Sequence, residues 1–422
     1  VSTTTCKNIK YFILLILITI IIFQFSLNLA QAQTNTLFPK NIYVSLHNKT
    51  HGYTNAFTLS RYKKPFYMWG SHLHLSDHTS TLLRPNLQQQ PFIGSEAQQF
   101  LFIPLDGGYY AIVNKENGQV IEESTTGDTL TNHTHPIKKT NLLMSGLWNG
   151  SDSQQWLIEK DKQTYHYYFR NKQSGKMMEV FKAEDYPDSG TPIHASEKQP
   201  VSRQLFVPNR NEAFPLPQCT IGKLGDIPHY QSYDTHLPET TQPVIVASTT
   251  LPAVMVKDSW EDKQKMQISP YYQLVKKQYW KKQEAHILAP GRERTITEIH
   301  GMTQIDVKSM TEKSGLTMKG DAGFTFQTLT ASLSSTITHE LDISRSTTIQ
   351  DMQERKIENT IRNTSTEKIA WARYVLVSEY HLERADGTFV STPWTYIHET
   401  DTRETVWPKE KIQQILMTSI EH

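Results

Sequence analysis

Cysteine is almost absent from this sequence, with two residues in 422. Cys6 lies in an N-terminal segment that we expect to be removed, which leaves Cys219 alone. A single cysteine forms no intrachain disulfide, so a hydrophobic core must stabilise the fold. We expect Cys219 to be an inert, half-buried thiol and not a nucleophile.

An excess of charge is also missing, because 43 Lys and Arg residues balance 42 Asp and Glu residues to a formal net charge of +1. General nucleic-acid binders normally carry a basic excess that neutralises phosphates. We therefore expect no nucleic acid among the partners of this protein.

One apolar run, YFILLILITIIIFQF (11–25), follows Lys7 and Lys10 near the N-terminus. Ala30-Gln31-Ala32 then supplies small residues at the spacing of a signal-peptidase site. We interpret residues 1–32 as a secretory signal peptide and expect a secreted chain that starts near Gln33. The alternative is a retained anchor helix, because the run is long for a signal.

The first half of the chain repeats itself at intervals of about fifty residues. Three Gln-x-aromatic triplets begin at Gln98, Gln154 and Gln204. Two of the copies align as GYYAIVNKENGQVIEES (108–124) and TYHYYFRNKQSGKMMEV (164–180), each with two strands around an Asn-Lys-x-x-Gly turn. A weaker copy, NIYVSLHNKTHGYTNAF (41–57), keeps the turn. Three such units cannot each bury a face alone but can close one common core.

This repeat resembles the ricin-type β-trefoil lectin family over residues 38–210. The resemblance implies carbohydrate binding, with the repeat glutamines and aromatics as structural core and not as sugar ligands. These core residues are Gln98, Phe100, Gln154, Trp156, Gln204 and Phe206.

In that family an acid four residues after the hairpin glycine binds sugar hydroxyls. Here those positions hold Glu122, Glu179 and, in the first copy, Ala56. The family also stacks an aromatic ring on the sugar, for which His194 and the nearby Tyr186 are candidates.

Two departures from the family pattern leave an alternative open. Glu replaces Asp, and the Asn that often precedes the repeat Gln is replaced by Ala97, Ser153 and Arg203. A trefoil kept only as a scaffold or a protein-docking surface would tolerate both changes.

Histidines alternate on two short stretches, His72-x-His74 with His78, and His133-x-His135. Such pairs can bind zinc, but no third ligand follows at the sequence spacing that is typical of a zinc site. We interpret them as exposed strand residues and predict neither a metal nor a cofactor.

Prolines gather between residues 208 and 256, which predicts an extended connector over 211–256 that packs along the surface. The next segment, SPYYQLVKKQYWKK (269–282), predicts a helix capped by Ser269 with Pro270 in its first turn. We expect this helix to pack on the following sheet. The alternative is that Trp280 and its neighbouring lysines contact a lipid headgroup layer.

Residues 257–422 form the second predicted domain, and long strands are expected from Glu293 onward. The strand segments are RTITEIHGMTQIDVKSM (294–310), STTIQDMQERKIENTIRNTS (346–365) and IAWARYVLVSEYHLERADGTFVSTPWTYI (369–397), the last with a hairpin turn at 385–388. Strands of this length are well above the usual five or six residues and favour an elongated sheet. The end of the chain, 409–422, is either a removable tail or a packed helix.

Residues 315–343 alternate between apolar and polar side chains, and the apolar side changes parity after Gln327-Thr328. This pattern predicts two strands, 316–326 and 329–343, joined by a short turn. Each is long enough to cross a membrane as an amphipathic β-strand. The outward positions are Leu316, Met318, Ala322, Phe324, Phe326, Leu329, Ala331, Leu333, Ile337 and Leu341. The alternative is an ordinary half-buried hairpin, which shows the same alternation.

The Ser/Thr-rich hairpin, its long flanking strands and the lectin-like first half together resemble the aerolysin-type β-pore-forming toxins. In overall plan they look most like the binary (Bin-type) insecticidal toxins. The resemblance implies an all-β chain with minor helix: an N-terminal β-trefoil followed by an elongated antiparallel aerolysin-like domain.

The resemblance also implies that the secreted toxin docks on host-cell glycans or a glycosylated receptor and inserts the hairpin into the target lipid membrane. One hairpin cannot close a barrel, so insertion requires a homo-oligomer. A second toxin subunit is a possible partner.

Two other functions stay open. One is a non-lytic lectin or receptor-binding subunit. The other is a lectin-bearing hydrolase, although the sequence holds no nucleophile elbow, and His339-Glu340 and His398-Glu399 lack the second His of a metalloprotease helix. We predict no catalytic residue.

Overall fold

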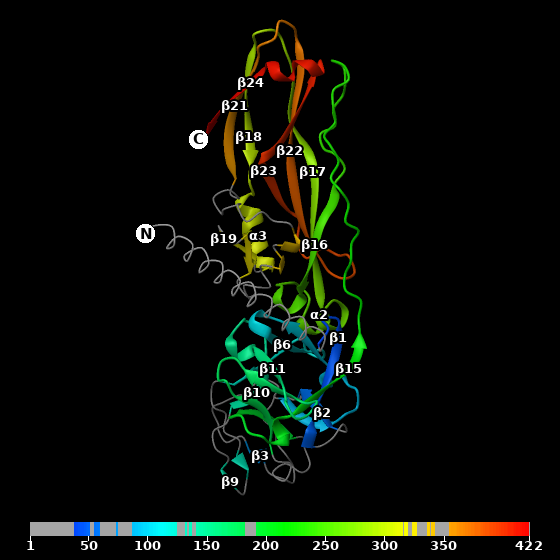
Figure 1. Ribbon diagram of the computed structural model, residues 1–422, viewed down its shortest axis with the longest axis vertical. Coiled ribbons are helices and arrows are strands. Elements are labelled where there is room, and N and C mark those ends of the chain that lie inside the picture. Colours follow the sequence, from blue (N-terminus) through cyan, green and yellow to red (C-terminus); the bar gives the residue numbers. More distant parts are fainter. Residues whose placement is uncertain are drawn as a thin grey trace, which may run out of the picture. The chain divides into compact units, whose positions relative to one another are not determined.

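The computed structural model (Figure 1) describes residues 38–50, 55–59, 73–74, 87–124, 131–132, 135–136, 141–181, 191–314, 316–319, 323–326, 336–337, 339–341 and 354–421. The chain divides into two compact units, Val1–Pro215 and Leu216–His422. Strands dominate the described parts of both units and helices are few, which confirms the all-β prediction. The predicted signal peptide, residues 1–32, lies outside the described residues.

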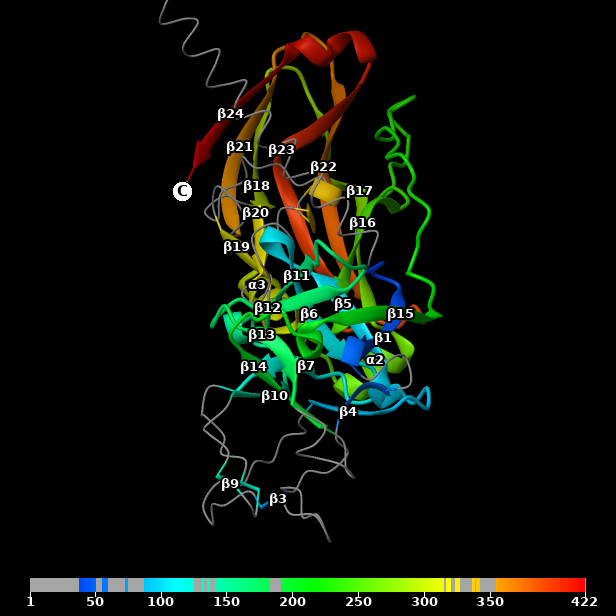
Figure 2. The ribbon, with the colours of Figure 1, turned by 60° about the horizontal axis from the view of Figure 1, so that its bottom comes forward.

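The first unit is a β-trefoil whose strands form one twelve-stranded antiparallel sheet around a common core (Figure 2). The strands are β1 (Ile42–Asn48), β2 (Asn55–Leu59), β4 (Leu87–Pro91), β5 (Phe100–Pro104), β6 (Tyr109–Asn114), β7 (Val120–Glu123), β10 (Asn141–Gly146), β11 (Trp156–Lys160), β12 (Tyr167–Asn171), β13 (Met177–Val180), β14 (Thr191–Ser196) and β15 (Phe206–Ala213). The last strand, β15, pairs with the first, β1, and so closes the sheet.

Smaller elements complete this unit. A separate small sheet contains β3 (Leu73–His74), β8 (Thr131–Asn132) and β9 (His135–Pro136). Short 3-10 helices are η2 (Glu96–Gln98), η3 (Asp106–Gly108), η4 (Asp152–Gln154) and η6 (Ser202–Gln204). Three of them, η2, η4 and η6, end on a repeat glutamine.

The repeat glutamines make the same buried contact in all three copies. The side-chain oxygens of Gln98, Gln154 and Gln204 each accept a hydrogen bond from the backbone N–H five residues earlier, at 2.9, 2.9 and 2.8 Å. The aromatic residues of the triplets, Phe100, Trp156 and Phe206, are buried in one cluster. Both positions of the repeat therefore lie in the core.

The turn asparagines fasten each copy to the copy before it. The amides of Asn48, Asn114 and Asn171 donate to the carbonyl oxygen of the residue preceding a repeat glutamine, at 3.0, 3.0 and 2.8 Å. Asn114 and Asn171 bind the first and second copies, and Asn48 binds the third. Three weak units thus close into a ring, because the first reaches back to the last.

The second unit contains two main antiparallel sheets. The four-stranded sheet has the order β16 (Val244–Pro252), β17 (Tyr271–Leu288), β22 (Ile369–Glu383) and β23 (Trp394–Trp407). The three-stranded sheet has the order β18 (Glu293–His300), β21 (Arg355–Asn363) and β24 (Ile415–Glu421). The helices are α2 (Asp262–Ile268), α3 (Gln304–Ser314), η7 (Ala253–Met255) and η9 (Lys409–Gln414).

The helix predicted over 269–282 is wrong, because this segment begins β17. This strand has 18 residues; Tyr271 to Gln278 pair with β16 on one side, and Gln273 to Leu288 pair with β22 on the other. Apolar spacing that fits one face of a helix also fits a strand buried on both faces. The neighbouring helix is α2, which ends at Ile268, just before this segment. Trp280 is buried (4% exposed), which does not fit the alternative of contact with lipid headgroups.

The strand predicted over 294–310 is correct only for its first part. β18 ends at His300, Gly301 takes a left-handed φ of 91°, and α3 follows. Thr303 accepts a hydrogen bond from the N–H of Asp306 at 3.1 Å, as a helix N-cap does. Alternation in the sequence did not reveal this capping signal.

Other boundaries differ in detail. The segment predicted as a connector contains the strand β16, and the C-terminal segment forms η9 and β24 and not a removable tail or packed α-helix. The predicted turn at 385–388 is present: the N–H of Arg384 donates to the carbonyl of Thr388 at 2.9 Å, and Gly387 has a φ of 81°. Of the two strands predicted in 369–397, the first is present as β22. The second begins only at Trp394, as β23, and continues to Trp407, beyond the predicted end.

The trefoil closure can be tested at Asn171. Replacing Asn171 by Ala removes its bonds to the carbonyl of Ser153 and the N–H of Gln173, which leaves buried groups unsatisfied. We expect unfolding of the trefoil to become easier by about 1–3 kcal/mol. Urea denaturation followed by tryptophan fluorescence measures this. The control Gln173→Ala, an exposed position of the same turn, should change stability by less than about 0.5 kcal/mol.

Candidate functional site

The two acids predicted to bind sugar are buried beside the repeat glutamines. Glu122 on β7 and Glu179 on β13 are 7% and 5% exposed. Glu122 accepts a hydrogen bond from Gln154 Nε2 at 2.9 Å, and Glu179 accepts one from Gln204 Nε2 at 2.8 Å. The structure thus brings each candidate acid together with the core glutamine of its own copy.

Arg203, one of the departures from the family pattern, forms an ion pair with Glu179. Its Nε and Nη2 both donate to Glu179 Oε1, at 3.1 and 2.8 Å. Burial raises the pKa of Glu179, but hydrogen bonds from Ser196, Gln204 and Arg203 outweigh it and hold the pKa below its usual value. The second copy has the neutral Ser153 at the position of Arg203. In the third copy the two departures from the family pattern, Glu179 and Arg203, therefore contact each other, which the sequence does not reveal.

His194 lies directly across from Glu179, because β13 and β14 pair at these residues. Its imidazole stacks on the ring of Phe181, with centroids 4.0 Å apart and planes inclined by 21°. Burial lowers the pKa of His194 to about 4, against the charge of Glu179. His194 and Phe181 thus form a neutral aromatic platform beside the carboxylate of Glu179. Tyr186 lies outside the described residues.

The two-strand prediction for 315–343 is wrong for the described residues of this segment. β19 (Leu316–Lys319) pairs with β20 (Gly323–Phe326), so the first predicted strand is itself a hairpin. In the second, Thr336, Ile337, His339 and Glu340 are helical. Ala322, Leu329, Ala331 and Leu333 lie outside the described residues.

The helical part of the segment is docked on the face of the four-stranded sheet. Ile337 and Leu341 are fully buried in a cluster with side chains of β16, β17, α3 and β23. Thr249 on β16 donates a hydrogen bond to Glu340, and Lys276 Nζ on β17 donates to the carbonyl of Leu341 at 3.2 Å. Two apolar side chains and two polar contacts therefore hold this part of the segment.

Helix α3, which leads into the segment, is attached to β23. Asp306 accepts a hydrogen bond from the N–H of Thr395 at 3.1 Å, and Ser309 accepts one from Trp394 Nε1 at 3.1 Å. Met310 is buried in the same cluster as Ile337 and Leu341. The N–H of Lys257 donates to the carbonyl of Lys313 at 2.8 Å, which connects the end of α3 to the loop before α2.

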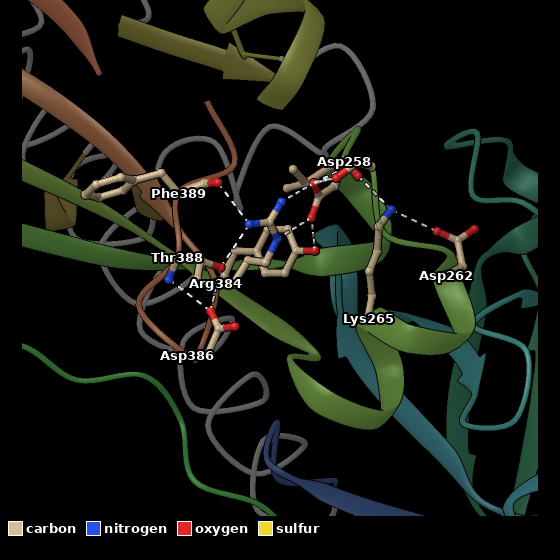
Figure 3. Close-up of polar contacts among 10 residues, drawn as sticks. Asp258, Asp262, Lys265, Arg384, Asp386, Thr388 and Phe389 are labelled. Atoms are coloured by element: carbon tan, nitrogen blue, oxygen red, sulfur yellow. Dashed lines mark hydrogen bonds and ion pairs between the residues drawn. The ribbon is translucent and has the colours of Figure 1, made fainter. Parts of the chain in front are cut away.

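That loop is fixed by a buried ion pair between Asp258 and Arg384 (Figure 3). Arg384 Nε and Nη2 donate to the two oxygens of Asp258 at 2.8 and 2.6 Å, and Tyr272 donates to Asp258 at 2.5 Å. The side chains of Arg384 and Asp258 are 9% and 1% exposed. Arg384 also donates to Thr388 Oγ1 at 2.9 Å. The pair joins the loop to the β22–β23 turn. Its two residues are 126 positions apart, so no local sequence pattern predicts this contact.

Arg384 and Asp258 complete a fully satisfied charge pair. Burial raises the pKa of Asp258, but hydrogen bonds from Arg384 and Tyr272 outweigh it and lower the pKa to about 2. The guanidinium also lies over the ring of Trp260, 4.9 Å from its centroid.

Within the described residues, no three His, Cys, Asp or Glu side chains gather as metal ligands would. The backbone of β3, β8 and β9 places residues 74 and 135 in one small sheet, while His72, His78 and His133 lie outside the described residues. No helix in the described part of the chain has the length and apolar character of a membrane span.

Two family models match the chain, one in each unit. Residues 97–196 match the ricin-type beta-trefoil lectin domain-like family, and residues 244–409 match the Insecticidal Crystal Toxin, P42 family. The binary larvicide subunit BinA of Lysinibacillus sphaericus is 25% identical over 324 residues, 74% of this chain and 81% of BinA. The subunit BinB of the same organism is 26% identical over 306 residues, 68% of this chain and 65% of BinB.

The crystal structure of Cry35Ab1 has the same fold, with a TM-score of 0.67 at 16% identity, over 88% of this chain and 91% of that one. This likeness confirms a trefoil-like first domain followed by a β-sheet domain.

The ion pair of Asp258 predicts a stability change. Arg384→Gln leaves a buried carboxylate without its cation, and we expect the second unit to lose about 3–5 kcal/mol of unfolding free energy. Guanidinium denaturation measures the loss. The control Lys308→Gln breaks the exposed pair with Glu312 and should cost less than about 0.5 kcal/mol. Equal effects of the two changes would contradict the role of the pair.

The same pair predicts a dependence on acid. Because the pKa of Asp258 is lowered to about 2 from 3.8, its contribution is fully present above about pH 4 and is lost as the pH falls toward 2. Arg384→Gln should flatten this part of the stability–pH curve for the second unit. An unchanged acid limb in the variant would show that other carboxylates account for it.

Proposed function

Because the chain joins a ricin-type lectin-like domain to an Insecticidal Crystal Toxin, P42 domain and is homologous to the binary larvicide subunits, we propose that it is a secreted insecticidal pore-forming toxin. The trefoil docks on glycans of the target cell. The second unit then oligomerises and inserts residues 315–343 into the membrane. The relatives are named as toxin subunits, which supports a role without catalysis and makes a second subunit a partner to test.

One observation carries this proposal: the described parts of 315–343 pair with neither main sheet of the second unit. β19 and β20 pair with each other, and residues 336–341 are attached by the contacts of Ile337, Leu341, Glu340 and the carbonyl of Leu341. Among the described residues, the segment can therefore leave without breaking a ladder of the four- or three-stranded sheet. Backbone hydrogen bonds in a sheet are cooperative and slow to open.

Insertion demands a closed barrel, because unpaired backbone groups in lipid each cost several kcal/mol. A single chain contributes one hairpin, and at least eight strands are typical of membrane barrels. The inserted state is therefore a homo-oligomer whose strands have refolded from the short hairpin and helical turn described above. The parity change at Gln327-Thr328 supports a turn there in the inserted state.

For the first unit, we assign glycan docking to the third copy. Phe181 and His194 form a stacked aromatic pair next to the carboxylate of Glu179, and aromatic faces with a nearby acceptor are what a sugar requires. Arg203 and Gln204 already use oxygens of Glu179, so this acid orients the site more than it binds freely. The aromatic platform is the better target for a test.

The docking assignment is tested by Phe181→Ala. Loss of the ring should weaken binding to the best glycan on an array by about tenfold, since an aromatic contact of this size contributes about 0.5–1.5 kcal/mol. Tyr165→Ala, which removes an exposed ring elsewhere in the trefoil (85% exposed), is the matched control and should bind normally. If the parent protein binds no glycan, the trefoil acts as a scaffold or a protein-docking surface.

The insertion assignment is tested by two double variants of opposite parity. Phe324→Asp with Phe326→Asp places charge on the lipid side of the hairpin, where a charge is unfavourable by an amount that depends on its depth in the bilayer. We expect dye release from liposomes to be abolished. Thr325→Asp with Gln327→Asp adds the same charge on the lumen side of the first strand and at the turn, and it should leave release within about threefold of the parent. Equal leakage by the two variants would show that 315–343 does not line the pore.

A further inference from the structure

Residues 216–243, here called the strap, cover one face of β17 and β22 in the second unit. The strap is the irregular green segment beside β16 and β17 in Figure 1, and it contains neither a helix nor a strand. Its apolar residues recur at steps of three or four along the chain, at Leu224, Ile227, Tyr230, Tyr233 and Leu237. These side chains pack on Trp280, Ala370, Ala372, Tyr374 and Leu376 of the sheet.

The strap is attached to the sheet differently from a strand. Backbone bonds hold its ends: Gly222 N–H donates to Ile245 at 2.7 Å, and Thr241 N–H donates to Trp280 at 2.9 Å. Between Lys223 and Pro238 the bonds to the sheet use side chains, such as Trp280 Nε1 to the carbonyl of Gly225 at 3.0 Å and Tyr374 to the carbonyl of Pro238 at 2.8 Å. The middle of the strap is therefore held by individual side chains and not by a continuous ladder.

The face of the sheet under the strap is apolar. β22 is an inner strand of this sheet, and both of its faces carry apolar side chains. On β22, Ala370, Ala372, Tyr374 and Leu376 point toward the strap, whereas Ile369 and Trp371 belong to the cluster with the three-stranded sheet. Displacing the strap would expose a row of small and aromatic side chains along two long strands. An exposed apolar face of this kind requires a partner.

We propose that the strap is exchanged between copies of this chain: in the oligomer, the strap of one copy covers the β17–β22 face of the next. The complementarity needed is already present, because an identical strap fits an identical face with the contacts described above. Exchange of an identical element is a low-cost route to association, and a head-to-tail exchange closes into a ring. This inference rests on the proposed function, because the pore requires an oligomer and the exchange would join its subunits.

The strap also lies in a suitable place along the chain. It is the covalent connection between β15 of the trefoil and β16 of the toxin domain. A pull on the trefoil acts first on the N-terminal part of the strap, which is held by the backbone bond from Gly222 to Ile245 and, four residues later, by the pair of Asp226 with Arg403 of β23. Both partners are about half exposed, at 63% and 51%, and a pair of exposed charges opens at little cost.

Cross-linking between positions 226 and 403 tests the exchange. One chain carries Asp226→Cys, a second carries Arg403→Cys, and both have Cys6 and Cys219 replaced by serine. The mixed chains are oligomerised on phosphatidylcholine vesicles containing extracted target-cell glycolipid and treated with a short bismaleimide. We expect cross-linked dimers at least about tenfold above a control mixture of Lys308→Cys and Arg403→Cys chains, because exchange sets a high effective concentration.

A chain with both Asp226→Cys and Arg403→Cys provides the second arm. Bridged before it meets vesicles, it should remain monomeric and lose leakage by about tenfold or more. The same chain capped with N-ethylmaleimide lacks the same ion pair but keeps a free strap, and it should still oligomerise and leak.

The outcomes separate the two proposals. If vesicles leak and rings form while the mixed chains give only control levels of dimer, the exchange is overturned and the proposed function stands. If no ring and no leakage form, the proposed function is overturned. Cross-linked dimers from concentrated mixed chains in solution then support the exchange by itself, and their absence overturns it.

Discussion

Apolar burial on both faces of β17 and β22 is the constraint on which the second unit depends. Cys219, the cysteine of the described residues, is free, so the stability of this unit comes from its core. Fully burying an apolar side chain contributes about 1.5–3 kcal/mol. The strands of the four-stranded sheet are too long for one covering layer. Part of the sheet is covered by α3 and residues 336–341, and another part by the strap on one face and the three-stranded sheet on the other.

These covers differ in how firmly they are held. The three-stranded sheet has complete internal ladders, and it is attached to the four-stranded sheet by the apolar cluster around Trp371 and by two backbone hydrogen bonds between Gly301 and Ile397. The loop before α2 is held by the buried pair of Asp258 and Arg384. The strap and residues 336–341 are held mainly by side chains. Segments with few backbone bonds to the rest of a fold open first. The parts that we propose to move are therefore the ones whose departure leaves the sheets intact.

The trefoil depends on contacts between its three copies, because each copy is too small to fold alone. Asn48, Asn114 and Asn171 join each copy to the one before it, and the repeat glutamines fix the segment between copies. In the third copy the same network also includes Glu179 and Arg203. A residue that matches a sugar-binding position in the sequence is here also part of the closure of the fold, so its two roles must be separated by experiment.

Local sequence alone is enough to set the class of each half. Repeats at fixed spacing predict the trefoil because each copy needs the same buried Gln and aromatic side chain. β22 follows from its long apolar run and from the turn at Gly387, whereas most of β23 lies beyond the predicted segment. Other elements depend on distant contacts. Tyr271, Leu274 and Tyr279 fit one face of a helix equally well, and only pairing with β16 and β22 makes this segment a strand.

Likewise, the alternation in 315–343 predicts two membrane strands, yet the described residues form a short hairpin and a helical turn, because Ile337 and Leu341 find a buried place on the sheet. A local pattern sets which side chains share a face. Contacts with residues far along the chain decide whether that face is used in a strand, a helix or, as we propose, first one and then the other.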